Sequence, residues 1–293
     1  MTKRVLVTGA QGQLGQSIRK VAADFPAFQV DFVGRAELDL TDDRAIQAFF
    51  ATRSYDYVIN AAAYTAVDQA ETEVALAAAV NHQAVQQLGE IAKEQGWVLL
   101  HVSTDYVFDG TQCRPYLESD AVNPLGVYGR TKHQGEQALL ETSPFGAIVR
   151  TSWVYSEFGG NFVKTMLRLA EQRDALKVVS DQVGSPTYAG DLAQVLLSMM
   201  AHFDSESSPP DMTIYHYSNE GVASWYDLAV ATFELQGLPI QVTPIETFEF
   251  PTQAARPAYS VLNKRKIKAD FKLAIPHWRA SLQACLNALQ SNR

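Results

Sequence analysis

The chain has 293 residues, of which 47% are hydrophobic and 19% are charged, a composition typical of soluble globular proteins. Its net charge of −8 and the lack of a long basic run exclude nucleic acid as an expected partner. No apolar run reaches the ~18 residues of a membrane span, and the run after Met1 is too short for a signal peptide. We therefore expect a cytoplasmic protein with no membrane partner.

The first half of the chain alternates short apolar runs with helical patterns. Continuous β-branched runs predict strands at 4–8, 29–33, 57–60, 97–103 and 147–152. Helical patterns follow at 13–23, 42–52, 70–95 and 128–142. Strands that are apolar on both faces are typical of a parallel sheet covered by helices on both sides. The alternation therefore predicts an α/β fold with a Rossmann-like, doubly wound parallel sheet.

The alternation breaks after about residue 155. The later patterns predict strands at 176–180 and 214–218, helices at 161–173, 189–201, 224–236 and 276–290, a polar loop at 204–211 and a proline-rich stretch at 239–257. We expect residues 1–155 to form a dinucleotide-binding domain. Residues 156–293 are expected to form mainly a smaller C-terminal substrate lobe, with some segments returning to the core.

A glycine-rich turn follows the first predicted strand. The sequence VTGAQGQLG places Gly9, Gly12 and Gly15 between that strand and a helix. Glycine allows a tight turn and a close backbone approach, and the start of a helix attracts phosphate. The spacing is GxxGxxG rather than GxGxxG, and a purely structural turn is the alternative. Its position at the first strand–helix junction favours binding of a dinucleotide.

The end of the second strand bears on which nicotinamide cofactor fits. The strand ends in VGR, and Arg35 replaces the acidic residue that would bind the ribose of NAD. A guanidinium suits a 2′-phosphate, so the sequence favours NADPH over NADH. The alternative is a solvated surface arginine. Asp39 follows at a place where it could accept a hydrogen bond from adenine. The small residues in the strand ending YVINAAAYT (57–65) would let a nucleotide lie against the backbone.

Hydroxyl, phenol and amine groups are expected at the same edge of the sheet. Thr104 and Asp105 follow the strand at 97–103, where ligands of parallel sheets bind. In YGRTK, Tyr128 and Lys132 stand four residues apart and share one helical face. We expect the ammonium to lower the pKa of the phenol so that it can exchange a proton. The alternative is a core aromatic residue beside a solvated lysine.

These motifs together resemble the extended short-chain dehydrogenase/reductases. INAAAYTAVDQAE (59–71), STDYVFDG (103–110), RTSWVY (150–155) and DQVGSPTYAGDLA (181–193) narrow the resemblance to the dTDP-4-dehydrorhamnose reductase family. The resemblance implies NADPH-dependent reduction of the C4 keto group of dTDP-4-dehydro-β-L-rhamnose, the last step of dTDP-L-rhamnose biosynthesis, with NADH used less readily. It also implies a place in synthesis of a cell-surface polysaccharide such as lipopolysaccharide O-antigen.

The resemblance assigns roles to individual residues. Thr104, Tyr128 and Lys132 are the expected catalytic group, and Thr104, Asp105, Trp153 and Arg256 the expected substrate contacts. The expected cofactor-binding set is Gly9, Gly12, Gln13, Leu14, Gly15, Arg35, Asp39, Leu40, Ala63, Tyr64, Thr65, Val102, Tyr128 and Lys132. The alternatives are another nucleotide-sugar 4-ketoreductase or epimerase, and a regulatory subunit that binds a dinucleotide without turnover.

One departure from the family pattern concerns metal and assembly. Some relatives carry acidic residues that hold magnesium at a dimer interface, where this chain has Gln16-Ser17 and Ala189-Gly190. The histidines show no metal-ligand spacing, and Cys113 and Cys285 are expected to be unpaired thiols. We therefore expect no bound metal, activity that is independent of magnesium, and, if a homodimer forms, no bridging metal ion.

Overall fold

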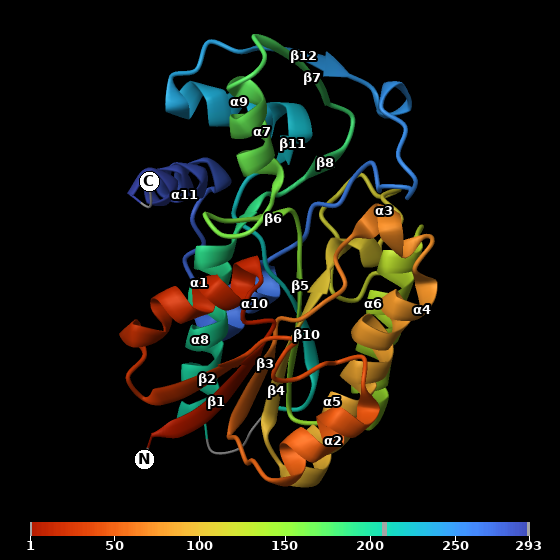
Figure 1. Ribbon diagram of the computed structural model, residues 1–293, viewed down its shortest axis with the longest axis vertical. Coiled ribbons are helices and arrows are strands. Elements are labelled where there is room, and N and C mark those ends of the chain that lie inside the picture. The colour runs from red at the N-terminus through yellow and green to blue at the C-terminus, as the bar shows by residue number, and fades with distance from the viewer. Residues whose placement is uncertain (1, 207–209, 292–293) are drawn as a thin grey trace.

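The centre of the computed structural model, which describes residues 2–206 and 210–291, is a six-stranded parallel sheet (Figure 1). Its strands are β1 (Lys3–Thr8), β2 (Phe28–Val33), β3 (Tyr57–Asn60), β4 (Val98–Thr104), β5 (Gly146–Thr151) and β10 (Thr213–His216). Their spatial order is β10-β5-β4-β3-β1-β2, and every neighbouring pair is parallel. The predicted doubly wound sheet is confirmed.

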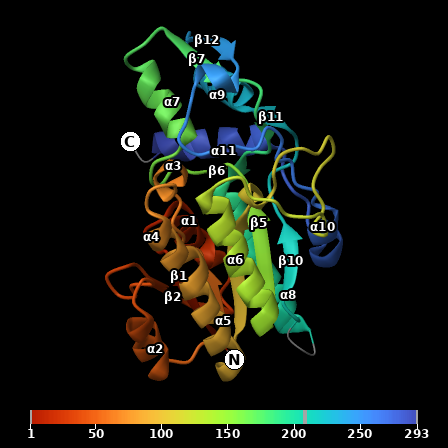
Figure 2. The same cartoon turned by 90° about the vertical axis from the view of Figure 1, so that its right-hand side faces the viewer.

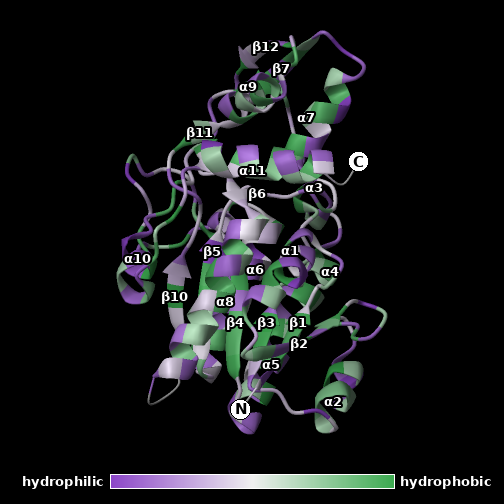
Figure 3. Cartoon of the chain, turned by 90° about the vertical axis from the view of Figure 1, so that its left-hand side faces the viewer, coloured by the Kyte–Doolittle hydropathy of each residue, from purple (hydrophilic) through white to green (hydrophobic). Residues whose placement is uncertain are grey.

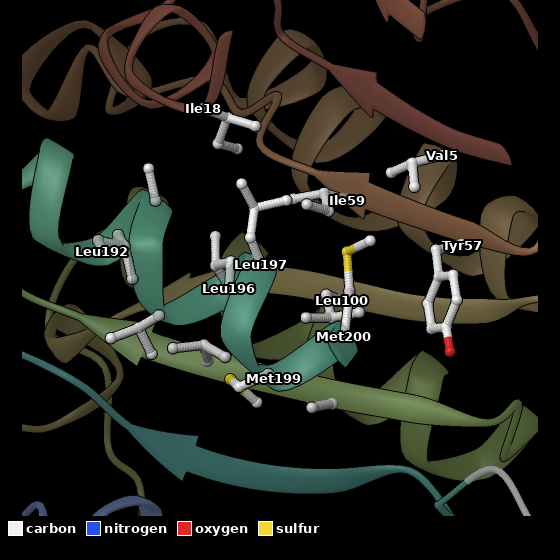
Figure 4. Packing of buried hydrophobic residues seen from close by; sticks show 14 of the residues in the cluster. Val5, Ile18, Tyr57, Ile59, Leu100, Leu192, Leu196, Leu197, Met199 and Met200 are labelled. Atoms are coloured by element: carbon white, nitrogen blue, oxygen red, sulfur yellow. The ribbon is translucent and has the colours of Figure 1, made fainter. Parts of the chain in front are cut away.

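Helices cover both faces of this sheet, which explains why its central strands carry mostly apolar residues (Figure 3). Helices α1 (Gln13–Val21) and α8 (Ala189–Ser205) cover one face, where Leu192 and Leu196 pack with Ile59 (Figure 4). Helices α2 (Asp43–Ala51), α5 (Ala84–Gln95) and α6 (Val127–Thr142) cover the other face (Figure 2). Successive strand residues alternate between the two buried clusters.

The strand order reverses between β1 and β3. The chain runs from β1 outward to β2 and then crosses back to β3 on the other side of β1. The connections after β1 and β3 therefore diverge and leave a crevice at the carboxyl ends of the strands, the usual ligand position in open parallel sheets. The glycine-rich turn lies in one of these connections and the small residues after Asn60 lie in the other.

A smaller lobe stands above the carboxyl edge of the sheet (Figure 1). It contains α7 (Phe162–Ala170), α9 (Trp225–Gln236), α11 (Trp278–Ser291) and the strand pairs β6 (Val154–Tyr155) with β9 (Thr187–Tyr188), β8 (Val183–Gly184) with β11 (Ala223–Ser224), and β7 (Ala175–Val179) with β12 (Gln241–Ile245). Helix α10 (Arg265–Phe271) lies beside β10 (Figure 2). The strand predicted at 176–180 is thus present, but it pairs with β12 rather than joining the main sheet.

Two features differ from the sequence prediction. Strand β12 lies in the proline-rich stretch and contains Pro244, a residue that argues against a strand except at an edge. The helix predicted at 70–95 begins at Val74, after a gap that separates it from the short helix α3 (Val67–Ala70). It then runs without a break through α4 (Val74–Ala78), a π-helical turn (Ala79–Gln83) and α5. The alanine-rich pattern does not reveal the gap or the π-helical turn. Of the loop predicted at 204–211, α8 extends into the first part, and residues 207–209 lie outside the described chain.

Both cysteines are free, with Cys113 exposed and Cys285 buried. Within residues 2–206 and 210–291, no helix is long and apolar enough to cross a membrane.

Candidate active site

A cavity of about 650 Å³ opens at the reversal of strand order, between the core and the lobe. All predicted cofactor-binding residues except Gly15 line it: Gly9, Gly12, Gln13, Leu14, Arg35, Asp39, Leu40, Ala63, Tyr64, Thr65, Val102, Tyr128 and Lys132. Gly159 and Gly160, from the loop before α7, also line the cavity. The sequence analysis missed this second glycine pair, although FGGNF is a visible signal.

The glycine turn has the tight backbone that its sequence predicts. Gly9 has a φ of +68°, and a Cβ there would lie 2.8 Å from the Ala62 nitrogen of the neighbouring connection. Gly15 faces the turn itself, and a Cβ on Gly15 would overlap the Gly9 oxygen. Gly12 is the N-cap of α1 and makes no side-chain cap hydrogen bond, and Gly12, Gln13 and Leu14 all line the cavity, so the start of the helix opens onto it. This cradle suits a pyrophosphate.

The tip of β2 holds both a cation and an acid. The Arg35 side chain is 72% exposed, and its Nε lies 3.2 Å from Asp39 Oδ2. Hydrogen bonds from Thr41, followed by the Arg35 interaction, hold the pKa of Asp39 below its usual value. The Glu37 carboxylate accepts a 2.8 Å bond from the Gly34 N–H. Glu37 therefore folds back onto the strand end and places an acid there beside Arg35, which the interpretation of Arg35 as a replacement for the acidic residue did not include.

The π-helical turn supports the connection that follows β3. Asn81, on this turn, accepts a hydrogen bond from the Tyr64 N–H at 2.9 Å and donates to the Tyr64 oxygen at 3.1 Å. It also donates to Thr131 on α6 at 3.2 Å. Bulges of this kind are frequent at functional sites. Here the bulge fixes the backbone of the cavity wall against the helix that carries the tyrosine–lysine pair.

Tyr128 and Lys132 lie on one face of α6, and both line the cavity. The Glu71 carboxylate accepts a 2.7 Å hydrogen bond from Val127 N–H and so stabilises the first turn of this helix, whose N-cap is a glycine. Thr104 ends β4, and its hydroxyl donates to Asp105 Oδ1 at 3.1 Å. The predicted catalytic residues are thus brought together by β4 and α6.

The electrostatics of Tyr128 differ from the sequence expectation. Burial raises the pKa of Tyr128 to about 12, the Thr104 hydroxyl offsets part of this, and the Asp105 charge raises it further. The Lys132 ammonium does not reach the phenol but donates to the Val102 oxygen at 2.7 Å and contacts His101 Nε2 at 3.2 Å. Burial lowers the pKa of Lys132 to about 8, although the Glu136 charge acts against this shift.

None of the predicted substrate residues, Thr104, Asp105, Trp153 and Arg256, lines the cavity. Asp105 is buried, and burial raises the pKa of its carboxyl to about 6. Hydrogen bonds from the hydroxyls of Ser260 and Thr104 act in the opposite direction and lower this pKa. Trp153 has a φ of +49° and stacks on Trp225, with ring centroids 3.6 Å apart. Arg256 is paired with Asp68 at 2.7 Å rather than free for a phosphate. The sequence analysis did not single out Trp225 as the partner of Trp153. Ordinary packing of two core aromatic residues would also explain this stacking.

Together these features define a class of protein. A glycine-rich turn at the reversal of strand order, a hydroxyl at the end of β4, and a tyrosine and lysine four residues apart on α6 are the arrangement of an extended short-chain dehydrogenase/reductase.

Comparison with known proteins narrows this class. The family described as the RmlD substrate binding domain matches residues 3–291. A dTDP-4-dehydrorhamnose reductase of Aggregatibacter actinomycetemcomitans is 45% identical over 96% of this chain and 97% of the relative. The chain belongs to this family of dTDP-4-dehydrorhamnose reductases. A relative from Streptomyces niveus, 37% identical over 100% of this chain and 99% of its own length, is a dTDP-4-keto-6-deoxy-D-glucose reductase.

Solved structures agree with this placement. A dTDP-4-dehydrorhamnose reductase from Clostridium acetobutylicum superposes with a TM-score of 0.91 at 40% identity, covering 98% of this chain and 99% of that one. A dTDP-4-dehydrorhamnose reductase from Bacillus anthracis in complex with NADP has a TM-score of 0.91 at 35% identity, covering 98% of this chain and 100% of that one.

Proposed function

We propose that the protein reduces the C4 keto group of dTDP-4-dehydro-β-L-rhamnose with NADPH and releases dTDP-β-L-rhamnose. The observation that carries this proposal is that Tyr128 and Lys132 line the same cavity as the glycine-rich turn. Relatives along the whole chain are dTDP-4-dehydrorhamnose reductases, and one of them is in complex with NADP. An acid–base pair beside a dinucleotide site suits reduction of a ketone.

The glycine turn would hold the pyrophosphate of the cofactor, and bound NADPH supplies hydride to C4. Asp39 and Leu40 would contact the adenine, residues 63–65 the middle of the cofactor, and Lys132 the ribose next to the nicotinamide. Tyr128 gives its proton to the carbonyl oxygen, and Thr104 polarises that oxygen. Because burial keeps Tyr128 protonated at neutral pH, the proton that it would donate is present before the reaction begins.

The lobe would bind the nucleotide sugar. Asp105, at the end of β4, and Trp153 would hold the sugar, since an aromatic face suits the C–H groups of a pyranose. Arg256 would contact the diphosphate once its ion pair with Asp68 opens. We therefore propose residues 1–155 as the NADP-binding domain and residues 156–293 as mainly the substrate lobe. Action in the cytoplasm, and a homodimer without bridging magnesium, stay predictions.

A second candidate is reduction of a different 4-keto sugar, which the Streptomyces niveus relative favours. The deciding assay follows NADPH oxidation with dTDP-4-dehydro-β-L-rhamnose, dTDP-4-keto-6-deoxy-D-glucose, and the UDP and GDP analogues of the first sugar. We expect stoichiometric NADPH consumption and the highest kcat/KM with the first substrate. A higher kcat/KM with another keto sugar would favour the second candidate. NADPH binding without consumption on any sugar would indicate a regulatory subunit instead.

A further inference from the structure

A row of polar side chains crosses the interior of the sheet beneath the proposed active site. Thr8 of β1, Asn60 of β3 and His101 of β4 are direct neighbours in the strand register. Their exposed fractions are 2%, 1% and 0%. They occupy the face covered by α5 and α6, on which Leu99 packs in the apolar core. A buried polar row within an apolar core is costly unless its groups are paired.

The row forms one continuous hydrogen-bond chain that ends on Lys132. The Thr8 hydroxyl lies 2.7 Å from Asn60 Oδ1, and the Asn60 amide nitrogen lies 3.1 Å from His101 Nδ1. On the other side of the ring, His101 Nε2 lies 3.2 Å from Lys132 Nζ. Both ends of the chain line the cavity, since Thr8 and Lys132 are wall residues. His101 therefore connects the glycine-turn strand with the lysine of the proposed active site.

We propose that His101, backed by Asn60 and Thr8, is a positioning residue that fixes the Lys132 amine for its cofactor contact in both of its charge states. This inference rests on the function proposed above. An ammonium has three N–H donors in a tetrahedral arrangement. The Val102 oxygen takes one and His101 Nε2 takes a second, so the direction of the third is fixed. Because Lys132 lines the cavity, this third donor is the one left for a ligand.

The chain has two directions that match the two charge states. A neutral imidazole has one N–H and one acceptor nitrogen. When Lys132 is neutral, donation runs from Thr8 through Asn60 and His101 to the amine lone pair. When Lys132 is charged it donates to Nε2, Nδ1 carries the hydrogen, and a half-turn of the Asn60 amide reverses the remaining bonds. Burial lowers the pKa of Lys132 to about 8, so both states are accessible near neutral pH.

Burial and the surrounding charges keep His101 neutral in both charge states of Lys132. Burial, followed by the charge on Lys132, holds the pKa of His101 well below its usual value. The other ionisable group facing this site is Glu136, one turn beyond Lys132 on α6, which forms a two-point ion pair with Arg150 of β5 and contacts His133. Tyr128 lies one turn before Lys132. His101 therefore acts through hydrogen bonds and not as a charge.

The test compares three variants by kcat, KM and NADPH affinity across pH, with NADPH binding measured by fluorescence titration. His101→Leu removes the acceptor, His101→Gln retains a carbonyl acceptor, and Leu99→Ala destabilises the same face of β4 without touching the chain. We expect His101→Leu to lower kcat about tenfold to a hundredfold. We also expect its NADPH binding to weaken about one pH unit earlier on the alkaline side. The bond that charged Lys132 donates to Nε2 is stronger than the bond that neutral Lys132 accepts, so its loss lowers the pKa of Lys132.

The outcomes separate positioning from mere stability. His101→Gln should recover a large part of both effects, and Leu99→Ala should lower Tm while leaving the pH dependence unchanged. If His101→Leu does not fold, Asn60→Leu breaks the chain one step earlier and should shift the alkaline limit in the same direction. Unchanged NADPH affinity and alkaline limit in the folded variants would overturn the proposal. Absence of sugar reduction by the wild type would refute only the proposed function, because NADPH binding still tests His101.

Discussion

The guanidinium of Arg256 contacts the carboxylate of Asp68 at two points, with Nη1–Oδ1 at 3.2 Å and Nη2–Oδ2 at 2.7 Å. The Ala254 N–H donates to the same carboxylate at 2.9 Å. These bonds fasten the chain segment around residue 255 to α3 of the core. The structure therefore presents Arg256 as a link between distant segments, whereas the sequence suggests a phosphate ligand.

Replacement of Arg256 distinguishes these two roles. We expect Arg256→Gln to raise KM for the nucleotide sugar about tenfold, as for loss of a charge-assisted bond to phosphate. NADPH affinity should not change. The matched variant Asp68→Asn keeps the guanidinium and should raise KM much less. An equal rise in both variants would show that Arg256 acts by fastening the segment and does not contact the diphosphate.

Tyr128→Phe removes the proposed proton donor and preserves the aromatic ring that packs edge-to-face on Tyr106. We expect kcat to fall at least a hundredfold, as for removal of a general acid. NADPH affinity and Tm should stay close to those of the wild type. The measurement is steady-state NADPH oxidation combined with a binding titration. Turnover at the wild-type rate would refute the assignment of the proton donor.

Asp105→Asn should change stability in a pH-dependent way. Burial raises the pKa of this carboxyl from 3.8 to about 6. The protonated carboxyl therefore makes its full contribution to stability below pH 3.8, and this contribution is lost as the pH rises through 6. The buried charge then costs on the order of 3 kcal/mol at pH 8. We expect Asp105→Asn to raise the free energy of unfolding at pH 8 but not at pH 3.

Urea unfolding at the two pH values checks this sign. Asp39→Asn is the matched control, because hydrogen bonds from Thr41 lower the pKa of Asp39 and its contribution is present above the ordinary pKa of 3.8. Asp39→Asn should therefore lower stability at pH 8. Equal destabilisation by Asp105→Asn at pH 3 and pH 8 would contradict the burial argument.

Arg35 should influence cofactor choice. Arg35→Ala removes the cation at the tip of β2, and Glu37→Gln removes the adjacent acid. We expect the first variant to lower the preference for NADPH over NADH several-fold, and the second to raise it, because a 2′-phosphate is attracted by the cation and repelled by the acid. The ratio of kcat/KM values for the two cofactors measures the effect. A ratio that neither variant changes would exclude this strand end from recognition of the 2′-phosphate.

Metal removal should leave the enzyme unchanged. The chain has Gln16-Ser17 and Ala189-Gly190 where some relatives have acidic residues, and Ser17 instead donates a hydrogen bond to the Gln13 oxygen at 2.9 Å. We expect the same kcat and the same molar mass in solution with EDTA and with magnesium. Loss of activity or of an oligomer in EDTA, restored by magnesium, would contradict this prediction.

The amino-acid sequence by itself determined the architecture of the core and the position of the cofactor turn. These features depend on local physics. Continuous apolar runs specify strands that are buried on both faces. Glycine at position 9 adopts the positive φ of the turn without the strain that a side chain would cause. Residues four apart on a helix share a face in any fold, so the sequence alone pairs Tyr128 with Lys132.

Only the tertiary structure decided how these groups are tuned. The pKa of Tyr128 rises because the phenol is shielded from water while Lys132 turns toward β4, and spacing along α6 does not reveal either fact. The pairing of β7 with β12, the contact of Arg256 with Asp68 and the link from His101 to Lys132 each join segments far apart in the chain. Such contacts depend on strand register and burial, which a local pattern cannot specify.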